Sequence, residues 1–212
     1  MVDEAVQKVL KKIHWLGHDA FRIDADKVIY IDPYQLEAGE PKADIILITH
    51  DHFDHYSPDD VKKLLKPGTT VVSIAAVTKK VRGAAVETVK PGDKVTVQGI
   101  AIEAVPAYNV DKQFHPKSAG HVGFIVTVDG VRIYHAGDTD FIPEMKGFRV
   151  DIALLPVSGT YVMTAEEAVQ AAGAIKPKLA IPMHYGAIVG GLSDAQRFAQ
   201  ACPVETVILE KS

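Results

Sequence analysis

Apolar and polar positions alternate with two different periods along this chain, and the dominant period changes more than once. Residues 3–12 carry apolar side chains at helical spacing behind Asp3, which predicts an amphipathic N-terminal helix capped by Asp3. The period then shortens to two, and turn residues such as Gly17-His18-Asp19 separate the short runs. These runs predict an antiparallel meander of strands at 13–16, 21–24 and 27–31.

From residue 43 onward the pattern becomes an alternation of strands and helices. The apolar run at 44–48 predicts a buried strand, and Ser57-Pro58 marks the start of a helix over 58–66. A strand at 70–74 and a helical segment at 75–82 follow. The remaining predicted elements are hairpin strands at 94–97, 100–105, 123–128 and 131–134, strands at 151–155, 178–182 and 204–209, and helices opening at Thr164 and Ser193.

The same order of elements, a meander followed by strand–helix units, occurs in both halves of the chain. This predicts an α+β fold in which two mixed sheets pack face to face with helices outside, a four-layer αββα sandwich. We expect residues 1–212 to form a single domain with the helix at 3–12 as an appendage. The functional loops should gather along one edge of the sandwich.

Composition excludes several classes of partner. A net charge of −4 and a pI near 6.1 provide no basic field, so we expect no nucleic-acid partner. Charged residues interrupt the N-terminal segment, and no apolar run approaches the roughly 18 residues of a membrane span, so no membrane partner is expected. Cys202 is the only cysteine, which favours a reducing compartment and a cytoplasmic location.

The densest chemical signal lies directly after the strand at 44–48. Residues 49–55 read Thr-His-Asp-His-Phe-Asp-His and hold three of the nine histidines. Imidazoles and carboxylates at this spacing suit zinc, with manganese or iron as alternatives. His50 and His52 can face one ion, and Asp54 and His55 another. Without a cation, polar residues crowded between a strand end and a helix start would be costly, which makes a purely structural cluster a poor explanation.

Two later strand ends offer further ligands. Asp138 ends the strand at 131–134 within Gly137-Asp138-Thr139 and is a candidate to bridge two ions. His184 follows the strand at 178–182 and can complete the second ion.

The missing ligand of the first ion must come from the loop at 106–121. His115 is the simplest choice, because the side-chain oxygen of Asn109 is a weak neutral donor, and His121 is a further alternative. Three other histidines could hydrogen-bond to ligands or contact substrate, namely His14, His18 and His135.

Together these motifs resemble the metallo-β-lactamase fold superfamily over about residues 13–209, and in particular its small UlaG-like metal-dependent hydrolase branch. The resemblance rests on the motif at 50–55 and on Gly17-His18, Ile31-Asp32-Pro33, Tyr134-His135-Ala136-Gly137-Asp138-Thr139 and Pro182-Met183-His184-Tyr185.

The resemblance implies two divalent metal ions. One would be held by His50, His52 and a third histidine, the other by Asp54, His55 and His184, with Asp138 as the bridge. The chain departs from the family pattern at Asn109, where the family commonly has a histidine after an Ala-aromatic pair. Either His115 takes that role, or the first ion is bound loosely, or the site holds one ion.

The predicted chemistry is hydrolysis of an ester, lactone or phosphodiester bond in a small-molecule substrate by a hydroxide that bridges the ions. Asp54 would orient the nucleophile, and His135, or Tyr108 or Tyr161, would protonate the leaving group. His52 stands where flavodiiron relatives have glutamate, which argues against redox chemistry. The alternative is a non-catalytic metal-binding regulatory or scaffold module. Self-association is open, although many proteins of this kind form homo-oligomers.

The substrate pocket is expected between loops at 33–42, 106–120, 156–163 and 185–193. Aromatic side chains on these loops would line it, namely Tyr34, Tyr108, Phe114, Tyr161 and Tyr185.

Overall fold

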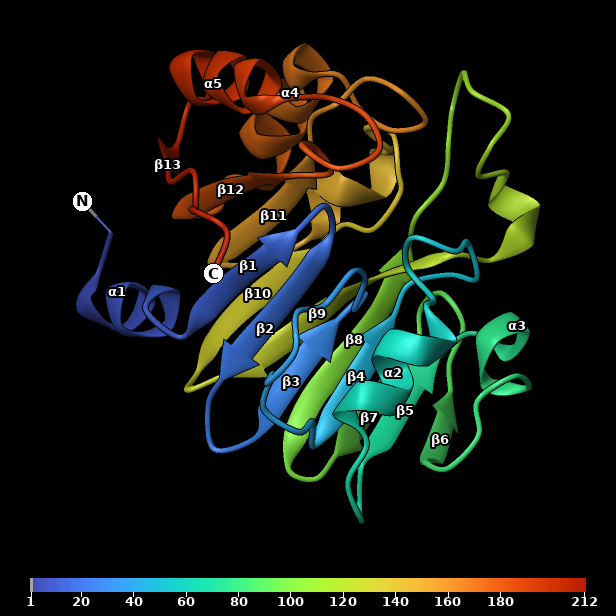
Figure 1. Cartoon of the computed structure of the whole chain (residues 1–212). Helices are drawn as coiled ribbons and strands as arrows, with labels where there is room; N and C mark the ends of the chain where they lie inside the picture. The colour runs from blue at the N-terminus through green and yellow to red at the C-terminus, as the bar shows by residue number, and fades with distance from the viewer. Residues whose placement is uncertain (1) are drawn as a thin grey trace.

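Two mixed β-sheets pack face to face in the computed structural model, which describes residues 2–212 (Figure 1). The first sheet has six strands in the order β1-β2-β3-β4-β5-β6, with bounds Ile13–Gly17, Ala20–Asp24, Val28–Ile31, Ile45–Ile48, Thr70–Ser73 and Ala85–Thr88. The second has seven in the order β13-β12-β11-β10-β9-β8-β7; from β7 to β13 their bounds are Lys94–Val97, Ile100–Pro106, Val122–Val128, Val131–His135, Ile152–Pro156, Leu179–Met183 and Glu205–Thr206.

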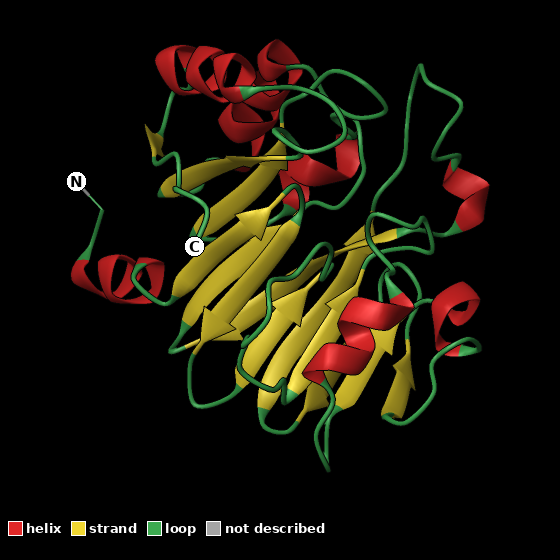
Figure 2. Cartoon of the chain, in the orientation of Figure 1, coloured by secondary structure: helices red, strands yellow, loops and turns green. Residues whose placement is uncertain are grey.

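Helices cover the outer faces of both sheets (Figure 2). Helices α4 (Ala165–Ile175) and α5 (Leu192–Ala201) pack on each other and on β11 and β12 of the second sheet. Helices α2 (Pro58–Leu64) and α3 (Ala75–Thr78) lie over the first sheet. This arrangement confirms the predicted αββα sandwich. Within residues 2–212, no helix has the length and apolar character needed to cross a membrane.

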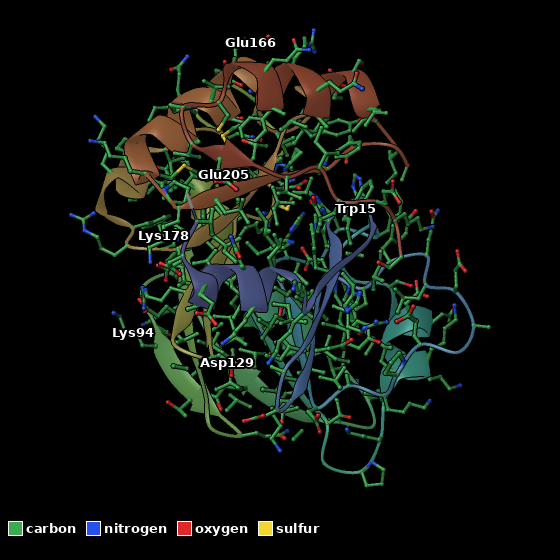
Figure 3. The ribbon with its side chains drawn as sticks, turned by 90° about the vertical axis from the view of Figure 1, so that its left-hand side faces the viewer. Trp15, Lys94, Asp129, Glu166, Lys178 and Glu205 are labelled. Atoms are coloured by element: carbon green, nitrogen blue, oxygen red, sulfur yellow. The ribbon has the colours of Figure 1, made fainter. Side chains whose placement is uncertain are left out.

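Helix α1 (Glu4–Leu10) lies at the end of the sandwich near β1 and β10. Asp3 caps it by accepting from the Val6 N–H at 3.0 Å, as predicted. In the side view of Figure 3, the helix lies between Lys178 above and Asp129 below. Lys178 pairs with Asp3 at 2.6 Å and Lys12 with Asp129 at 2.6 Å, so exposed ion pairs bracket this helix. Such pairs add little stability, and the buried side chains of α1 contribute more.

Capping side chains mark the starts of α2, α4 and α5. Ser57 accepts from the Asp60 N–H at 3.3 Å at the start of α2. Thr164 and Glu167 form the predicted reciprocal capping box at the start of α4. At α5, Asp194 instead accepts from the Gly191 N–H, so that helix starts at Leu192, one residue earlier than predicted.

Two predicted elements were wrong in extent, and one strand was not predicted. The segment at 75–82 is helical only over Ala75–Thr78, and the chain then forms β6, an edge strand that the sequence pattern did not predict because most of its side chains are exposed. The last strand pairs only over Glu205–Thr206 instead of 204–209. Beyond it the chain crosses to the first sheet, where the Ser212 N–H donates to the Trp15 carbonyl at 2.9 Å.

The loops that follow β4, β10 and β12 converge at one end of the two sheets. The Val122 N–H of β9 donates to the Thr49 carbonyl at 3.3 Å, which ties the second sheet to the loop after β4. The backbone segments approach each other so closely here that two positions require glycine. A Cβ on Gly137 would lie 3.0 Å from the Thr49 side chain. A Cβ on Gly123 would lie 2.7 Å from the carbonyl oxygens of His135 and Ala136.

We predict that Gly123→Ala lowers the free energy of unfolding by about 1–3 kcal/mol, because the added methyl group meets backbone atoms that can move only with β10. Gly147→Ala is the matched control, since nothing lies within 4 Å of its added Cβ. Urea unfolding of both variants measures the difference. Equal midpoints for the two variants would show that β10 yields freely at this point.

Candidate metal centre

The histidine-rich loop between β4 and α2 is anchored by Asp32 at the end of β3. Its two carboxylate oxygens accept from the Thr49 N–H at 2.8 Å, the Thr49 hydroxyl at 2.7 Å and His55 Nδ1 at 2.7 Å. The loop then folds back on itself, since the N–H groups of His55 and Tyr56 both donate to the His52 carbonyl. This turn brings histidines from the start and the end of the motif close together.

A first group of possible ligands comprises His50, His52, His115 and Asp138. His52 Nδ1 lies 3.0 Å from His50 Nε2 and 3.2 Å from His115 Nε2, and His115 Nε2 lies 3.1 Å from Asp138 Oδ2. Burial, together with the charge on His55, holds the pKa of His50 well below its usual range, and burial and His115 lower that of His52. These imidazoles are therefore neutral and have lone pairs available for a cation.

A second group comprises His18, Asp19, His55 and His184, all buried, with one donor atom from each within 4.8 Å of the others. Asp138 also faces this group, because its Oδ1 lies 3.3 Å from both His55 Nε2 and His184 Nε2. One carboxylate thus contacts both groups, as the proposed bridging role requires.

Unsatisfied polar atoms concentrate in the second group. Among residues 2–212, six atoms at this point are buried and have no hydrogen-bond partner, namely His18 Nδ1, both oxygens of Asp19, His55 Nε2, Asp138 Oδ1 and His184 Nε2. Buried polar atoms are nearly always paired, and several orphans facing one point are the pattern that an ion would satisfy.

Opposite charges at this point shift the pKa values strongly. Burial disfavours ionisation of both His55 and His184, but Asp138 with Asp32 raises the pKa of His55 well above its usual range, and Asp138 with Asp19 raises that of His184 to about 9. Burial likewise opposes the charge on Asp138, yet the two imidazoles lower its pKa well below the usual range. Charges of opposite sign are therefore concentrated at this one buried point.

Four of the inward-facing imidazoles are held by a partner on their other ring nitrogen. Thr49 lies 3.0 Å from His50 Nδ1, Asn109 lies 3.1 Å from His115 Nδ1 and Ser158 lies 2.8 Å from His184 Nδ1, while Asp32 holds His55. Such partners select the tautomer with a free Nε2 lone pair. The backbone is strained at the same place, with positive φ at His18 (53°), Asp32 (46°), Tyr161 (71°) and His184 (60°).

The third histidine of the first group is His115, and neither Asn109 nor His121 belongs to that group. Asn109 Oδ1 accepts from the His115 N–H at 2.9 Å and faces His115 Nδ1, so Asn109 orients this histidine. His121 stacks on His50 with ring centroids 4.6 Å apart, and burial lowers its pKa to about 4.

Asp54 and His135 occupy different environments. Asp54 Oδ2 lies 3.7 Å from His55 Nε2 and 3.1 Å from His18 Nε2, at the edge of the second group. His135 is fully buried, and both its ring nitrogens face backbone atoms, the Asp19 carbonyl at 2.9 Å and the Gly137 N–H at 3.2 Å. The prediction that His135 protonates a leaving group therefore has no geometric basis, because this ring does not reach the cavity.

Sequence reasoning assigned no role to two residues of the centre, Asp19 and Asp32. Asp19 follows Gly17-His18, so it resembled an ordinary turn aspartate. Asp32 stands before a proline at the end of a buried strand, and that position was the available signal that its side chain points into the protein.

A cavity of about 530 Å³ opens over the first group. Its acidic and histidine lining includes His52, Asp54, His115 and Asp138, and its apolar and aromatic lining consists of Phe53, Phe114, Tyr161 and Ile188. Phe114 and Tyr161 line it as predicted, whereas Tyr34, Tyr108 and Tyr185 do not.

The comparisons with known proteins agree with this geometry. A family model described as a β-lactamase superfamily domain matches residues 12–184. A UPF0173 metal-dependent hydrolase from Archaeoglobus fulgidus is 36% identical over 222 residues, covering 94% of this chain and 96% of that protein.

Two solved structures share the fold over nearly the whole length. A protein from Parabacteroides distasonis is 35% identical with a TM-score of 0.84, covering 94% of this chain and 93% of that one. Igni18, a metallo hydrolase from Ignicoccus hospitalis, is 27% identical with a TM-score of 0.77, covering 94% and 95%. This chain therefore belongs to the metallo-β-lactamase superfamily and, within it, to the UPF0173 metal-dependent hydrolases.

Proposed function

We propose that this metal-dependent hydrolase works with a dinuclear centre. The first ion would be held by His50, His52 and His115, the second by Asp54, His55 and His184, and both by Asp138. The single observation that carries the proposal is the position of Asp138, whose Oδ2 lies 3.1 Å from His115 Nε2 while its Oδ1 lies 3.3 Å from His184 Nε2. Zinc fits the imidazole-rich first group, with manganese or iron as alternatives.

Bound divalent ions would polarise a scissile carbonyl or phosphoryl group and supply a hydroxide near neutral pH. The surrounding side chains would orient the reactants. Asp54 lines the cavity and is held by His18. Burial opposes its charge, but the His18 hydrogen bond and the charge on His55 together lower the pKa of Asp54, so a carboxylate is available to orient the nucleophile. Tyr161 also lines the cavity, which supports it as proton donor, whereas the Tyr108 hydroxyl donates to Glu144.

The non-catalytic alternative depended on an absent third ligand for the first ion. The distance of 3.2 Å between His115 Nε2 and His52 Nδ1 supports His115 in that role, and the alternative loses its main argument.

The lining of the cavity favours an ester or lactone with an apolar group over a phosphodiester. Phe53, Phe114 and Ile188 expose 67%, 55% and 40% of their surface around the opening. Among the described residues that line the cavity, none is lysine or arginine. The nearby Lys80 and Lys112 are paired with Asp51 and Asp140, each at 2.8 Å, so a phosphate group would find no free cationic side chain.

We predict that protein purified without added metal contains close to two equivalents of divalent ion, and that His115→Ala lowers this content towards one because the first group loses a donor. Elemental analysis by mass spectrometry measures both values. Chelation should abolish hydrolysis of chromogenic esters, and added zinc or manganese should restore it.

Asn109→Ala is the informative comparison, since it keeps His115 but removes its partner. This substitution should lower the affinity for the first ion by roughly tenfold, as loss of a ligand-orienting hydrogen bond commonly does, without abolishing binding. One equivalent or fewer in the unmodified protein, unchanged by His115→Ala, would refute the dinuclear centre.

We predict that Asp32→Asn weakens metal binding roughly 10–100-fold, because an amide cannot hold His55 Nδ1–H and both Thr49 donors as the carboxylate does. Asp44→Asn provides the control, since Asp44 accepts from the Val28 N–H at 2.9 Å just before β4, away from the centre. Calorimetric titration with zinc measures the affinities. Equal affinities in the two variants would mean that the loop backbone alone sets the orientation of His55.

We predict that Phe114→Ala lowers kcat/KM for long-chain p-nitrophenyl esters by roughly tenfold and leaves the acetate ester nearly unchanged, because only a long acyl group buries against this ring. Val86→Ala is the matched control, since Val86 is similarly exposed, at 45%, but lies on β6 away from the cavity. Identical chain-length profiles for both variants would contradict an apolar substrate at this opening.

A further inference from the structure

The carboxylate of Asp19 is an unusual group to find buried. It lies in the turn between β1 and β2, is fully inaccessible, and neither of its oxygens has a hydrogen-bond partner among residues 2–212. The backbone fixes its direction, because His18 adopts a positive φ of 53° and the Asp19 carbonyl accepts from His135 Nε2 at 2.9 Å. The side chain is thereby held facing His55 Nε2, 3.7 Å from its Oδ2.

Burial makes this position costly for a carboxylate. Its two oxygens lose their contacts with water and gain no hydrogen-bond donor in return. Like charge adds to this cost, because the carboxylates of Asp138 and Asp32 contact the same His55 ring, at 3.3 Å and 2.7 Å. A cation between Asp19 and its neighbours would accept lone pairs from the Asp19 oxygens and would offset the negative charge of the carboxylates.

The distances around His55 Nε2 match those between ligands of one ion. Its neighbours are Asp138 Oδ1 at 3.3 Å, Asp19 Oδ2 at 3.7 Å and Asp54 Oδ2 at 3.7 Å. Ligands bound at about 2.1 Å are separated by roughly 3.0 Å at octahedral angles and roughly 3.4 Å at tetrahedral angles. Small side-chain movements therefore suffice to place all of these donors around one ion.

We propose that Asp19 is an additional ligand of the second ion, and that the two halves of the centre consequently bind different metals. The inference rests on the dinuclear centre proposed above. The second donor set then has three carboxylates, Asp19, Asp54 and Asp138, beside the imidazoles of His55, His184 and His18. The first has a single carboxylate, Asp138, with three imidazoles.

The two donor sets differ in the ion that they suit. Three imidazoles and one carboxylate form a tetrahedral site typical of zinc. A site with three carboxylates and more than four donors suits the harder, six-coordinate ions, here manganese(II) or iron(II). The extra negative charge also offsets the second positive charge of a divalent ion in a fully buried position. We therefore expect zinc at the first position and manganese or ferrous iron at the second.

The test uses Asp19→Asn, which preserves shape and removes the charge. Metal-free protein is equilibrated with equal concentrations of zinc and manganese, desalted, and measured by elemental analysis and manganese electron paramagnetic resonance. The unmodified protein should retain one zinc and one manganese. Asp19→Asn should keep its zinc and bind manganese at least tenfold more weakly.

Asp51→Asn is the matched control, because Asp51 lies in the same histidine-rich loop but pairs with Lys80 at 2.8 Å. It should retain both metals. Asp19→Ser serves as a second variant, and thermal unfolding with and without manganese shows directly how much the ion stabilises each folded protein.

The outcomes separate the two proposals. Manganese retention by Asp19→Asn equal to that of the unmodified protein would overturn the role of Asp19. Two zinc ions in the unmodified protein under competition would overturn the division between two metals. Both outcomes would leave a dinuclear hydrolase intact. Fewer than two ions in the unmodified protein would refute the dinuclear centre itself and this inference with it.

Discussion

The fully buried charge of Asp138 is the constraint on which this end of the molecule depends. The carboxylate follows β10 of the second sheet, yet the imidazoles nearest to it include His55, which follows β4 of the first sheet. A charge in such a place must be paired, and its partners come from both sheets. Pairing the charge of this one side chain therefore holds loops of the two sheets together at this end of the molecule.

That requirement explains why so much of the surrounding chain orients these imidazoles. Thr49, Asp32, Asn109 and Ser158 each hold the outer nitrogen of one imidazole, so the inner nitrogens face the same volume. Rotation of any one ring would leave a buried nitrogen unpaired and would separate a donor from Asp138. The positive φ values at His18, Asp32 and His184 show that the backbone accepts local strain to hold this arrangement.

The sandwich could be predicted from sequence because strand period, helix caps and turn residues agree with one another along most of the chain. The exceptions, β6 and the short β13, are edge strands in which burial does not impose an alternating pattern. In the centre, the motif at 50–55, Asp138 and His184 stand at strand ends and could be recognised there. The environment of Asp19 could not, because its isolation from hydrogen-bond partners depends on side chains distant in sequence.

The same burial that makes the centre costly without an ion also defines its chemistry. Apolar side chains such as Phe53 and Phe114 surround the opening, while carboxylates and imidazoles line the interior. A substrate that covers the opening with an apolar group excludes water, and electrostatic interactions inside the cavity then strengthen because the local dielectric constant falls. Binding of the apolar group and polarisation of the reactive bond are therefore coupled. In the proposed hydrolase, a substrate that left the opening exposed to water would receive less of that polarisation. Selectivity for apolar groups would then follow from the electrostatics of the centre as well as from contact area.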